Sequence, residues 1–240
     1  MILPYGSIWR ETMGKCFVCE NETFENTGTC FSQCTKCKLY INWDYLPKEE
    51  LRNHLKDFVL SSQHNQESYN GRAAEAQEQL DVIESVLPHK GKLFDVACGH
   101  GAFIVEALKR GWEAYGNELS VAASYWSDHY NLPIQTTFFD ELDFDDESYD
   151  AVVMWNSLEH LHNPKEDLIK SYNMLKKGGV IFIRVPERNA ENLNKYLEPF
   201  HRVEFNKINL RKILEDTGFT VLTHESVDDG FEAQDILCQK

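Results

Sequence analysis

Residues 91–240 repeat one pattern, in which short apolar runs alternate with longer segments that have the apolar spacing of helices. Residues 93–96 form such a run around one aspartate, and residues 102–108 follow it with helical spacing. A short apolar run between turn residues predicts a buried strand, and apolar residues three and four positions apart predict a helix. Repetition of this strand–helix unit predicts a doubly wound α/β fold with helices on both faces of the sheet.

The pattern indicates seven strands in all. They are expected at residues 93–96, 112–116, 133–139, 149–155, 180–185, 220–226 and 233–238. Helices are expected at residues 102–108, 121–130, 163–175 and 206–216. The third of these helices should begin at Pro164 and end in the turn over residues 175–179, because lysines followed by glycine are strong helix stop signals.

Residues 46–90 indicate helices ahead of this repeat. The first should follow Pro47, whose acidic neighbours Glu49 and Glu50 suit a first helical turn. The second is expected from about residue 71 to residue 87, with the polar stretch 61–70 as a joint between the two.

The composition is that of a globular protein with acidic balance. The 240 residues carry a formal net charge of −15, with 42% hydrophobic residues. Because nucleic-acid affinity comes largely from neutralised phosphates, this charge argues against a nucleic-acid partner. The sequence also lacks an apolar run long enough for a membrane span and a basic, apolar N-terminal signal, so we expect a cytoplasmic location.

Five of the seven cysteines lie in one short N-terminal segment. Four of them form two C-x-x-C pairs separated by 14 residues. Two such pairs supply four thiolates, which is the ligand set of a closed tetrahedral zinc site. We predict a zinc ribbon over residues 1–45, with redox cysteines as the alternative. The structural Zn²⁺ would be held by Cys16, Cys19, Cys34 and Cys37.

The first predicted strand runs into a glycine turn with the sequence D-V-A-C-G-H-G. Strand, glycine turn and helix form the phosphate- or nucleotide-binding edge of doubly wound sheets. This run resembles motif I of the class I S-adenosylmethionine (SAM)-dependent methyltransferases, whose usual form is D-x-G-C-G-x-G. Asp95, Cys98, Gly99 and Gly101 match it, and Ala97 stands at a family glycine. Because alanine is small, we expect the loop to keep its shape.

The resemblance implies a set of SAM-binding residues beyond this loop. Glu118 lies about 20 residues further on, where an acid can accept both ribose hydroxyls; the alternative is a glutamate at a helix start. Asp140 matches the family's acid near the adenine amino group. The complete predicted cofactor-binding set is Asp95, Ala97, Cys98, Gly99, Gly101, Glu118, Leu119, Asp140, Glu141 and Asn156.

Two histidines are candidates for the chemistry. The run L-E-H over residues 158–160 resembles the ubiquinone-biosynthesis methyltransferases and related small-molecule and glycan enzymes, whose E-x-L-E-H pattern can hold a divalent cation. Asn156 replaces the first acid here. His160 is then a candidate general base for a substrate hydroxyl, or a residue that braces its loop. His201, in a P-F-H run typical of the same group, is the second candidate.

Together these motifs identify the chain as resembling a SAM-dependent methyltransferase. The resemblance implies a Rossmann-like, seven-stranded mixed sheet that ends in an antiparallel hairpin. We divide the chain into a zinc ribbon (1–45), a helical cap or linker (46–90) and a methyltransferase domain (91–240). The expected acceptor is a small molecule or glycan, through an oxygen. An RNA methyltransferase and a non-catalytic SAM-binding scaffold are the alternatives, and the sequence leaves the oligomeric state open.

Overall fold

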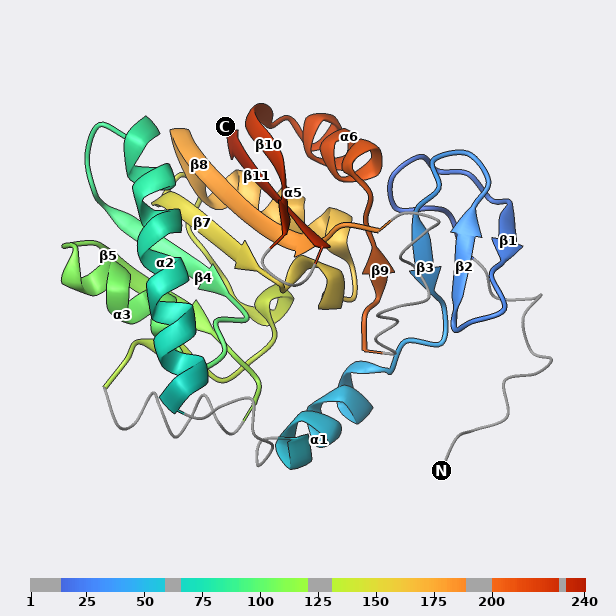
Figure 1. Cartoon of the computed structure of the whole chain (residues 1–240), viewed down its shortest axis with the longest axis horizontal. Helices are drawn as coiled ribbons and strands as arrows, with labels where there is room; N and C mark the ends of the chain where they lie inside the picture. The colour runs from blue at the N-terminus through green and yellow to red at the C-terminus, as the bar shows by residue number, and fades with distance from the viewer. Residues whose placement is uncertain (1–13, 59–65, 121–130, 189–199, 229–231) are drawn as a thin grey trace.

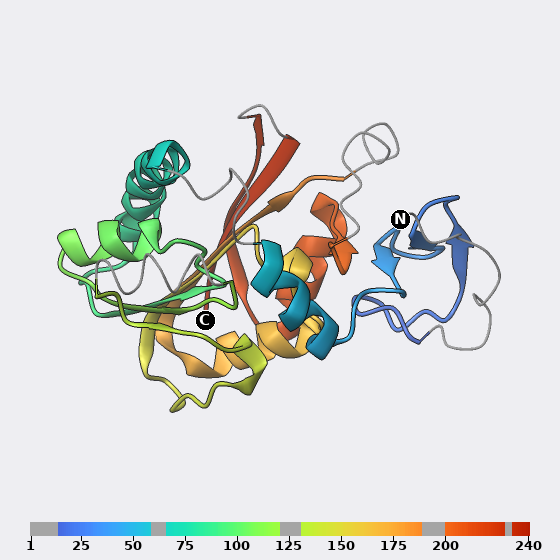
Figure 2. The same ribbon diagram turned by 90° about the horizontal axis from the view of Figure 1, so that it is seen from below.

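A computed structural model describes residues 14–58, 66–120, 131–188, 200–228 and 232–240. The larger part is a seven-stranded sheet with helices on both sides, and a small sheet near the N-terminus lies beside it (Figure 1). The segment from the small sheet to the large one passes through helix α1 (Lys48–Phe58). Figure 2 shows α1 between the two sheets when the molecule is seen from below.

The large sheet has the strand order β10-β11-β8-β7-β4-β5-β6. The pairs β4–β5, β4–β7, β5–β6 and β7–β8 are parallel, whereas β11 is antiparallel to both β8 and β10. The predicted mixed sheet with a C-terminal antiparallel hairpin is therefore confirmed. The strands are β4 (Lys92–Val96), β5 (Glu113–Asn117), β6 (Ile134–Gln135), β7 (Tyr149–Trp155), β8 (Leu175–Pro186), β10 (Thr220–Asp228) and β11 (Glu232–Gln239).

Successive residues of the central strands enter two different hydrophobic cores. Leu93 and Val153 pack in one core, whereas their neighbours Phe94 and Val152 pack in the other. Side chains of a strand alternate between the two faces of a sheet, so both faces must be covered. This explains why these strands are continuous apolar runs rather than alternating ones.

Among the described residues, two helices cover each face of the sheet. Helices α2 (Gln66–Val86) and α3 (Ala102–Lys109) share one core, and α5 (Pro164–Met174) and α6 (Lys207–Thr217) share the other. Asn206 caps α6 with a reciprocal bond to Asn209, and Gly218 ends it in a left-handed conformation. Over the described ranges, no helix combines the length and apolar character that crossing a membrane would require.

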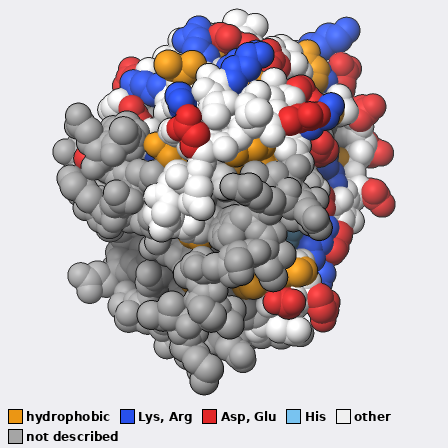
Figure 3. Space-filling model, turned by 90° about the vertical axis from the view of Figure 1, so that its right-hand side faces the viewer, with side chains coloured by type: hydrophobic (Ala, Val, Ile, Leu, Met, Phe, Trp, Pro, Cys, Tyr) orange, Lys and Arg blue, Asp and Glu red, His pale blue; other side chains and the backbone are white. Residues whose placement is uncertain are grey.

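The small sheet joins residues from opposite ends of the chain. Its order is β1-β2-β3-β9, with β1 (Phe24–Asn26), β2 (Phe31–Cys34), β3 (Tyr40–Asn42) and β9 (Val203–Glu204). All three pairings are antiparallel. In the space-filling view from this side, the described surface carries acidic and basic side chains side by side (Figure 3).

Three expected elements differ in extent from those observed. The third strand ends at Gln135 rather than at residue 139, because β5 ends at Asn117 and leaves it no further partner. Residues 139–141 form the 3₁₀ helix η2 (Phe139–Glu141) instead. Helix α5 ends at Met174, and the lysine–glycine turn belongs to β8, which begins where Leu175 pairs with Tyr149.

The helices ahead of the sheet also differ from the prediction. Helix α2 begins at Gln66, so Gly71 lies inside it and part of the expected joint is helical. The predicted helix at 121–130 and the first 13 residues of the predicted ribbon lie outside the described residues.

Candidate functional site

The loops that follow β4, β5, β6 and β7 carry the predicted cofactor residues. Because these strands are parallel, their carboxyl ends lie at the same edge of the sheet, where doubly wound folds bind ligands. The loop after β4 contains Ala97, Gly99 and Gly101, with φ values of 54°, 55° and 75°. Left-handed conformations suit glycine, so Ala97 keeps the backbone shape of the family glycine that it replaces. Asp95 is buried at the end of the strand.

Glu118 closes this loop from the neighbouring strand. Its carboxylate accepts the backbone N–H of Gly99 at 3.0 Å, and its other oxygen accepts the N–H groups of Leu119 and Ser120 at 2.7 and 2.8 Å. The N–H of Cys98 donates to the carbonyl of Asn117 at 2.9 Å. The structure therefore brings the two predicted motifs into direct contact.

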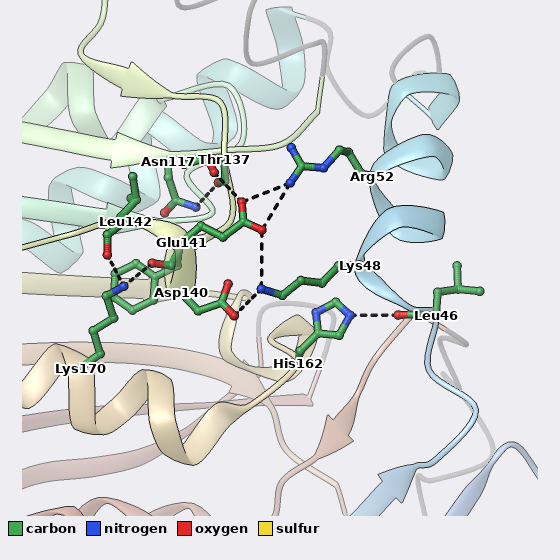
Figure 4. Close-up of polar contacts among 11 residues, drawn as sticks. Leu46, Lys48, Arg52, Asn117, Thr137, Asp140, Glu141, Leu142, His162 and Lys170 are labelled. Carbon is green, nitrogen blue, oxygen red and sulfur yellow. Dashed lines mark hydrogen bonds and ion pairs between the residues drawn. The ribbon is translucent and has the colours of Figure 1, made fainter.

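Asp140 and Glu141 lie on η2 and face helix α1 (Figure 4). Lys48 is 2.5 Å from Asp140, and Arg52 is 3.2 Å from Glu141. A hydrogen bond from Thr137, together with Arg52, lowers the pKa of Glu141. Two basic side chains of helix α1, Lys48 and Arg52, thus pack against the acids that the sequence assigns to the cofactor.

Two observations indicate that a SAM molecule fits at this edge of the sheet. A Cβ added to Gly99 would have no described heavy atom within 4 Å, so a ligand can approach this backbone closely. Ser120 Oγ and Trp155 Nε1 are buried and have no hydrogen-bond partner among the described residues. Asn156, next to Trp155, has a φ of 49°, and its N–H donates to the carbonyl of Arg184 at 2.8 Å.

The two candidate bases, His160 and His201, lie against each other. Their ring centres are 4.5 Å apart, with the rings nearly perpendicular. His160 belongs to the 3₁₀ helix η3 (Leu158–His160) after β7, and its Nδ1 is 2.9 Å from the carbonyl of Phe200. Nδ1 must carry the proton in this contact, which leaves Nε2 as an acceptor.

His201 forms a second contact that the sequence analysis missed. Its Nδ1 is 2.7 Å from Glu204 Oε1, and Glu204 Oε2 accepts Nε of Arg188 at 2.9 Å. Glu204 is completely buried. The signal available in the sequence was an H-x-x-E spacing, which becomes a contact only when the turn before β9 is known.

The electrostatics distinguish the two histidines. Burial, assisted by the positive charge of His201, lowers the pKa of His160 to about 4. Burial opposes protonation of His201 too, but the hydrogen bond and charge of Glu204 outweigh it and raise the pKa of His201. Burial raises the pKa of the neighbouring Glu159 to about 7, and both of its oxygens lack a hydrogen-bond partner among the described residues.

Glu159, His160 and His201 place ligand-type atoms within 4.8 Å of one another. Carboxylate and imidazole groups bind divalent cations as well as protons. The Glu204 carboxylate beside this cluster already accepts hydrogen bonds from Nδ1 of His201 and Nε of Arg188. A histidine held by a buried carboxylate favours a cluster that handles protons.

The four predicted zinc ligands also come together. Sγ atoms of Cys16 and Cys37 are 3.4 Å apart, and those of Cys19 and Cys34 are 3.5 Å apart. All four lie within 4.8 Å of one another. Thiolates bound to one tetrahedral zinc are separated by roughly 3.8 Å, so this arrangement fits a four-cysteine zinc site.

A sheet of this order, with a glycine loop after its central strand and an acid after the next one, defines the class I SAM-dependent methyltransferase fold. A family model described as a methyltransferase domain matches residues 63–224. The chain therefore belongs to this methyltransferase domain family.

Relatives and solved structures agree with this assignment. The chain is 27% identical over 148 residues to a probable SAM-dependent methyltransferase of Mycolicibacterium smegmatis, covering 59% of this chain and 58% of the relative. It spans about half the length of the curated relatives it matches. The fold is similar to 1,6-didemethyltoxoflavin-N1-methyltransferase of Burkholderia thailandensis, with a TM-score of 0.64, 15% identity, and coverage of 90% of this chain and 98% of that one.

The same fold also occurs in a protein named for a different reaction. The [4+2]-cyclase SpnF matches with a TM-score of 0.56 and 16% identity, over 68% of this chain and 80% of that one. At such identities the likeness concerns the fold alone. The activity of this chain has to be argued from its own site.

Proposed function

We propose that this protein transfers the methyl group of SAM to a hydroxyl oxygen of a small-molecule or glycan acceptor. The observation that carries the proposal is the buried pair of His201 and Glu204, 2.7 Å apart, beside the carboxyl end of β7. A histidine oriented by a carboxylate is the usual arrangement of a general base that must work near neutral pH.

The chain's own residues align the acceptor and remove its proton. Because Nδ1 of His201 donates to Glu204, its Nε2 carries the lone pair that accepts the hydroxyl proton as the new O–C bond forms. Glu204 stabilises the resulting imidazolium, and Arg188 holds Glu204 in place. His160, with its pKa of about 4, stays neutral and orients the hydroxyl through Nε2 rather than taking its proton. When bound, SAM supplies a methyl group activated by its positively charged sulfur.

The cofactor would be held at the edge of the large sheet. Glu118 is the acceptor for the ribose hydroxyls, and Asp140 is the acceptor for the adenine amino group. Gly99 gives the backbone room that the ligand needs. Support for this assignment comes from the contact between Glu118 and Gly99 and from the matched family.

The N-terminal cysteines would bind a structural Zn²⁺. The segment buries few large apolar side chains of its own around Phe31 and Tyr40, so metal binding would contribute folding free energy. A closed four-thiolate site leaves no position for substrate. One zinc per chain with four sulfur ligands by X-ray absorption would support this assignment, and loss of that signal in Cys34→Ser would be its control.

The base is tested by comparing three variants. SAM affinity is measured by calorimetry, and turnover is followed as S-adenosylhomocysteine formed with a panel of phenols and hydroxylated sugars. His201→Asn should lower turnover by about 10²- to 10⁴-fold, and Glu204→Gln by a smaller factor, with SAM affinity within about twofold of the parent. His224→Asn, on the edge strand β10, is the matched control and should keep full turnover.

The dependence of turnover on pH gives a second test of His201 as the base. His201 must be deprotonated to accept a proton, and its pKa is raised, so turnover should increase with pH through a midpoint above the ordinary histidine value. Full turnover in His201→Asn, or a flat profile between pH 6 and 9, would contradict the proposal. Unchanged turnover on addition of Mg²⁺ or Mn²⁺ separates this mechanism from a cation-assisted one.

A further inference from the structure

The predicted zinc ribbon shares a sheet with the segment that carries the catalytic pair. Strand β3 is antiparallel to β9, and the register places Tyr40 opposite Glu204 and Ile41 opposite Val203. Glu204 is the carboxylate that holds His201. The backbone of the dyad acid is therefore positioned by a strand of the ribbon.

Asn42 extends this contact beyond the paired strands. Its backbone N–H donates to the carbonyl of Arg202 at 2.9 Å, and its side-chain amide donates to the carbonyl of His201 at 3.3 Å. Asn42 is only 2% exposed, so water competes little for these bonds. The ribbon thus holds the main chain at His201 itself.

Arg202 connects the same segment to the cysteine-bearing loop. Its guanidinium lies 5.1 Å from the ring centre of Phe17 and 5.4 Å from that of Trp43, within range of cation–π attraction. Phe17 lies between Cys16 and Cys19. The backbone N–H of Arg202 donates to the carbonyl of Glu159 at 2.7 Å. A displacement of the cysteine loop is therefore passed by direct contact to the segment beside the candidate bases.

The four cysteines lie next to both of these connections. Cys34 is the last residue of β2, and β2 pairs with β3 from Phe31 opposite Asn42 to Gln33 opposite Tyr40. Zinc bound to the four sulfurs would fix this hairpin relative to the loop that carries Phe17. The metal would thereby hold the strand contact and the aromatic contact in one arrangement.

We propose that the metal-loaded ribbon is a positioning element of the acceptor site, which sets the orientation of the pair formed by His201 and Glu204 through β3 and Arg202. This inference rests on the proposed function of that pair. The cofactor loops are held by different contacts, because Glu118 bonds to Gly99 and to its own two successors. Disturbing the ribbon should therefore lower turnover while leaving SAM affinity nearly unchanged.

The first test uses zinc-loaded protein and a matched pair of variants. Arg202→Lys keeps the charge but loses the planar group that stacks on Phe17 and Trp43. Turnover should fall about 10- to 100-fold, as expected for a slightly misplaced catalytic group, with SAM affinity within about twofold. Lys165→Gln is the control, because it breaks another contact between the ribbon and the methyltransferase domain, the 2.7 Å pair with Glu20. It should keep normal turnover.

The second test does not depend on turnover. The titration of the His201 imidazole is followed by NMR of histidine labelled at Cε1, in zinc-loaded protein, after EDTA treatment and in Arg202→Lys. The charged or titratable groups that face His201 are Glu204 on β9, Glu159 and His160 on η3, and Arg188 after β8. If the ribbon positions the pair, zinc removal and Arg202→Lys should each move the His201 midpoint toward the ordinary histidine value.

The outcomes separate this inference from the proposed function. A His201 midpoint that stays the same after zinc removal and in Arg202→Lys overturns the inference, whatever the turnover. A midpoint that moves while His201→Asn keeps full turnover upholds the inference and rejects His201 as the base. If the EDTA-treated chain unfolds, the comparison of Arg202→Lys with Lys165→Gln decides. Equal losses of turnover and SAM affinity in Arg202→Lys would show general damage and overturn the inference.

Discussion

Two glycines in the loop after β4 have different surroundings, although they lie only two residues apart. Both adopt positive φ. A Cβ on Gly99 would project into open space, whereas one on Gly101 would lie 2.7 Å from Leu132 and 3.0 Å from Ile134. Gly101 is therefore the more crowded position, against the ends of two flexible side chains, whereas Gly99 leaves open space beside the loop.

This difference predicts unequal effects of the same substitution at the two positions. Gly99→Ala should cost about 1 kcal/mol of unfolding free energy, the strain of a left-handed alanine, and should lower SAM affinity strongly. Gly101→Ala should cost somewhat more, about 2 kcal/mol, because the ends of Leu132 and Ile134 must also move aside. Urea unfolding and calorimetry with SAM measure both quantities. Similar stability losses, or normal SAM affinity in Gly99→Ala, would refute the assignment.

The short helix η3 gathers two ionisable groups whose pKa values move in opposite directions. His160 has its pKa lowered to about 4, and Glu159 has its pKa raised to about 7. His160 stabilises the folded state above pH 6.5, which is the pKa of histidine in the unfolded chain. This stabilisation is lost as the pH falls toward 4. For Glu159, the folded state favours the protonated form, so its contribution is lost as the pH rises from 4.5 through 7.

Glu159→Gln should therefore stabilise the folded protein most at high pH. The variant removes a buried carboxyl that must ionise, so its unfolding free energy should gain on the parent by roughly 3 kcal/mol between pH 4.5 and pH 8. Urea unfolding at both values measures the gain. Glu215→Gln, at an exposed helix position, should show no such trend. A difference between variant and parent that does not change with pH would contradict the burial of Glu159.

At the level of elements, the sequence predicted those strands and loops whose pattern lies within one continuous segment. The apolar runs predicted the strands, and the glycine pattern located the loop that contacts Glu118. It failed for β9, because two residues make no periodic pattern and their partner strand is about 160 positions away. Missing β9 also concealed Glu204 as the partner of His201. The roles of the site residues remain predictions that the experiments above address.

At the scale of the whole molecule, charge bears on the choice of acceptor. The net charge of −15 and the mixed charges on the ribbon-side surface (Figure 3) give little attraction for a polyanion. We expect no saturable binding of a structured RNA in a filter assay at 50 mM salt. Tight binding that weakens steeply with salt would instead favour the RNA methyltransferase alternative.

The pairing of β3 with β9 also constrains how the protein is made. Asn42 and Arg202 are 160 residues apart. At ordinary rates of synthesis, β2 and β3 leave the ribosome about 10 to 30 s before β9, the fourth strand of the small sheet. During that interval the edge of β3 has no native partner. The four proposed zinc ligands are synthesised early, but the ribbon sheet is completed only after most of the methyltransferase domain has been synthesised.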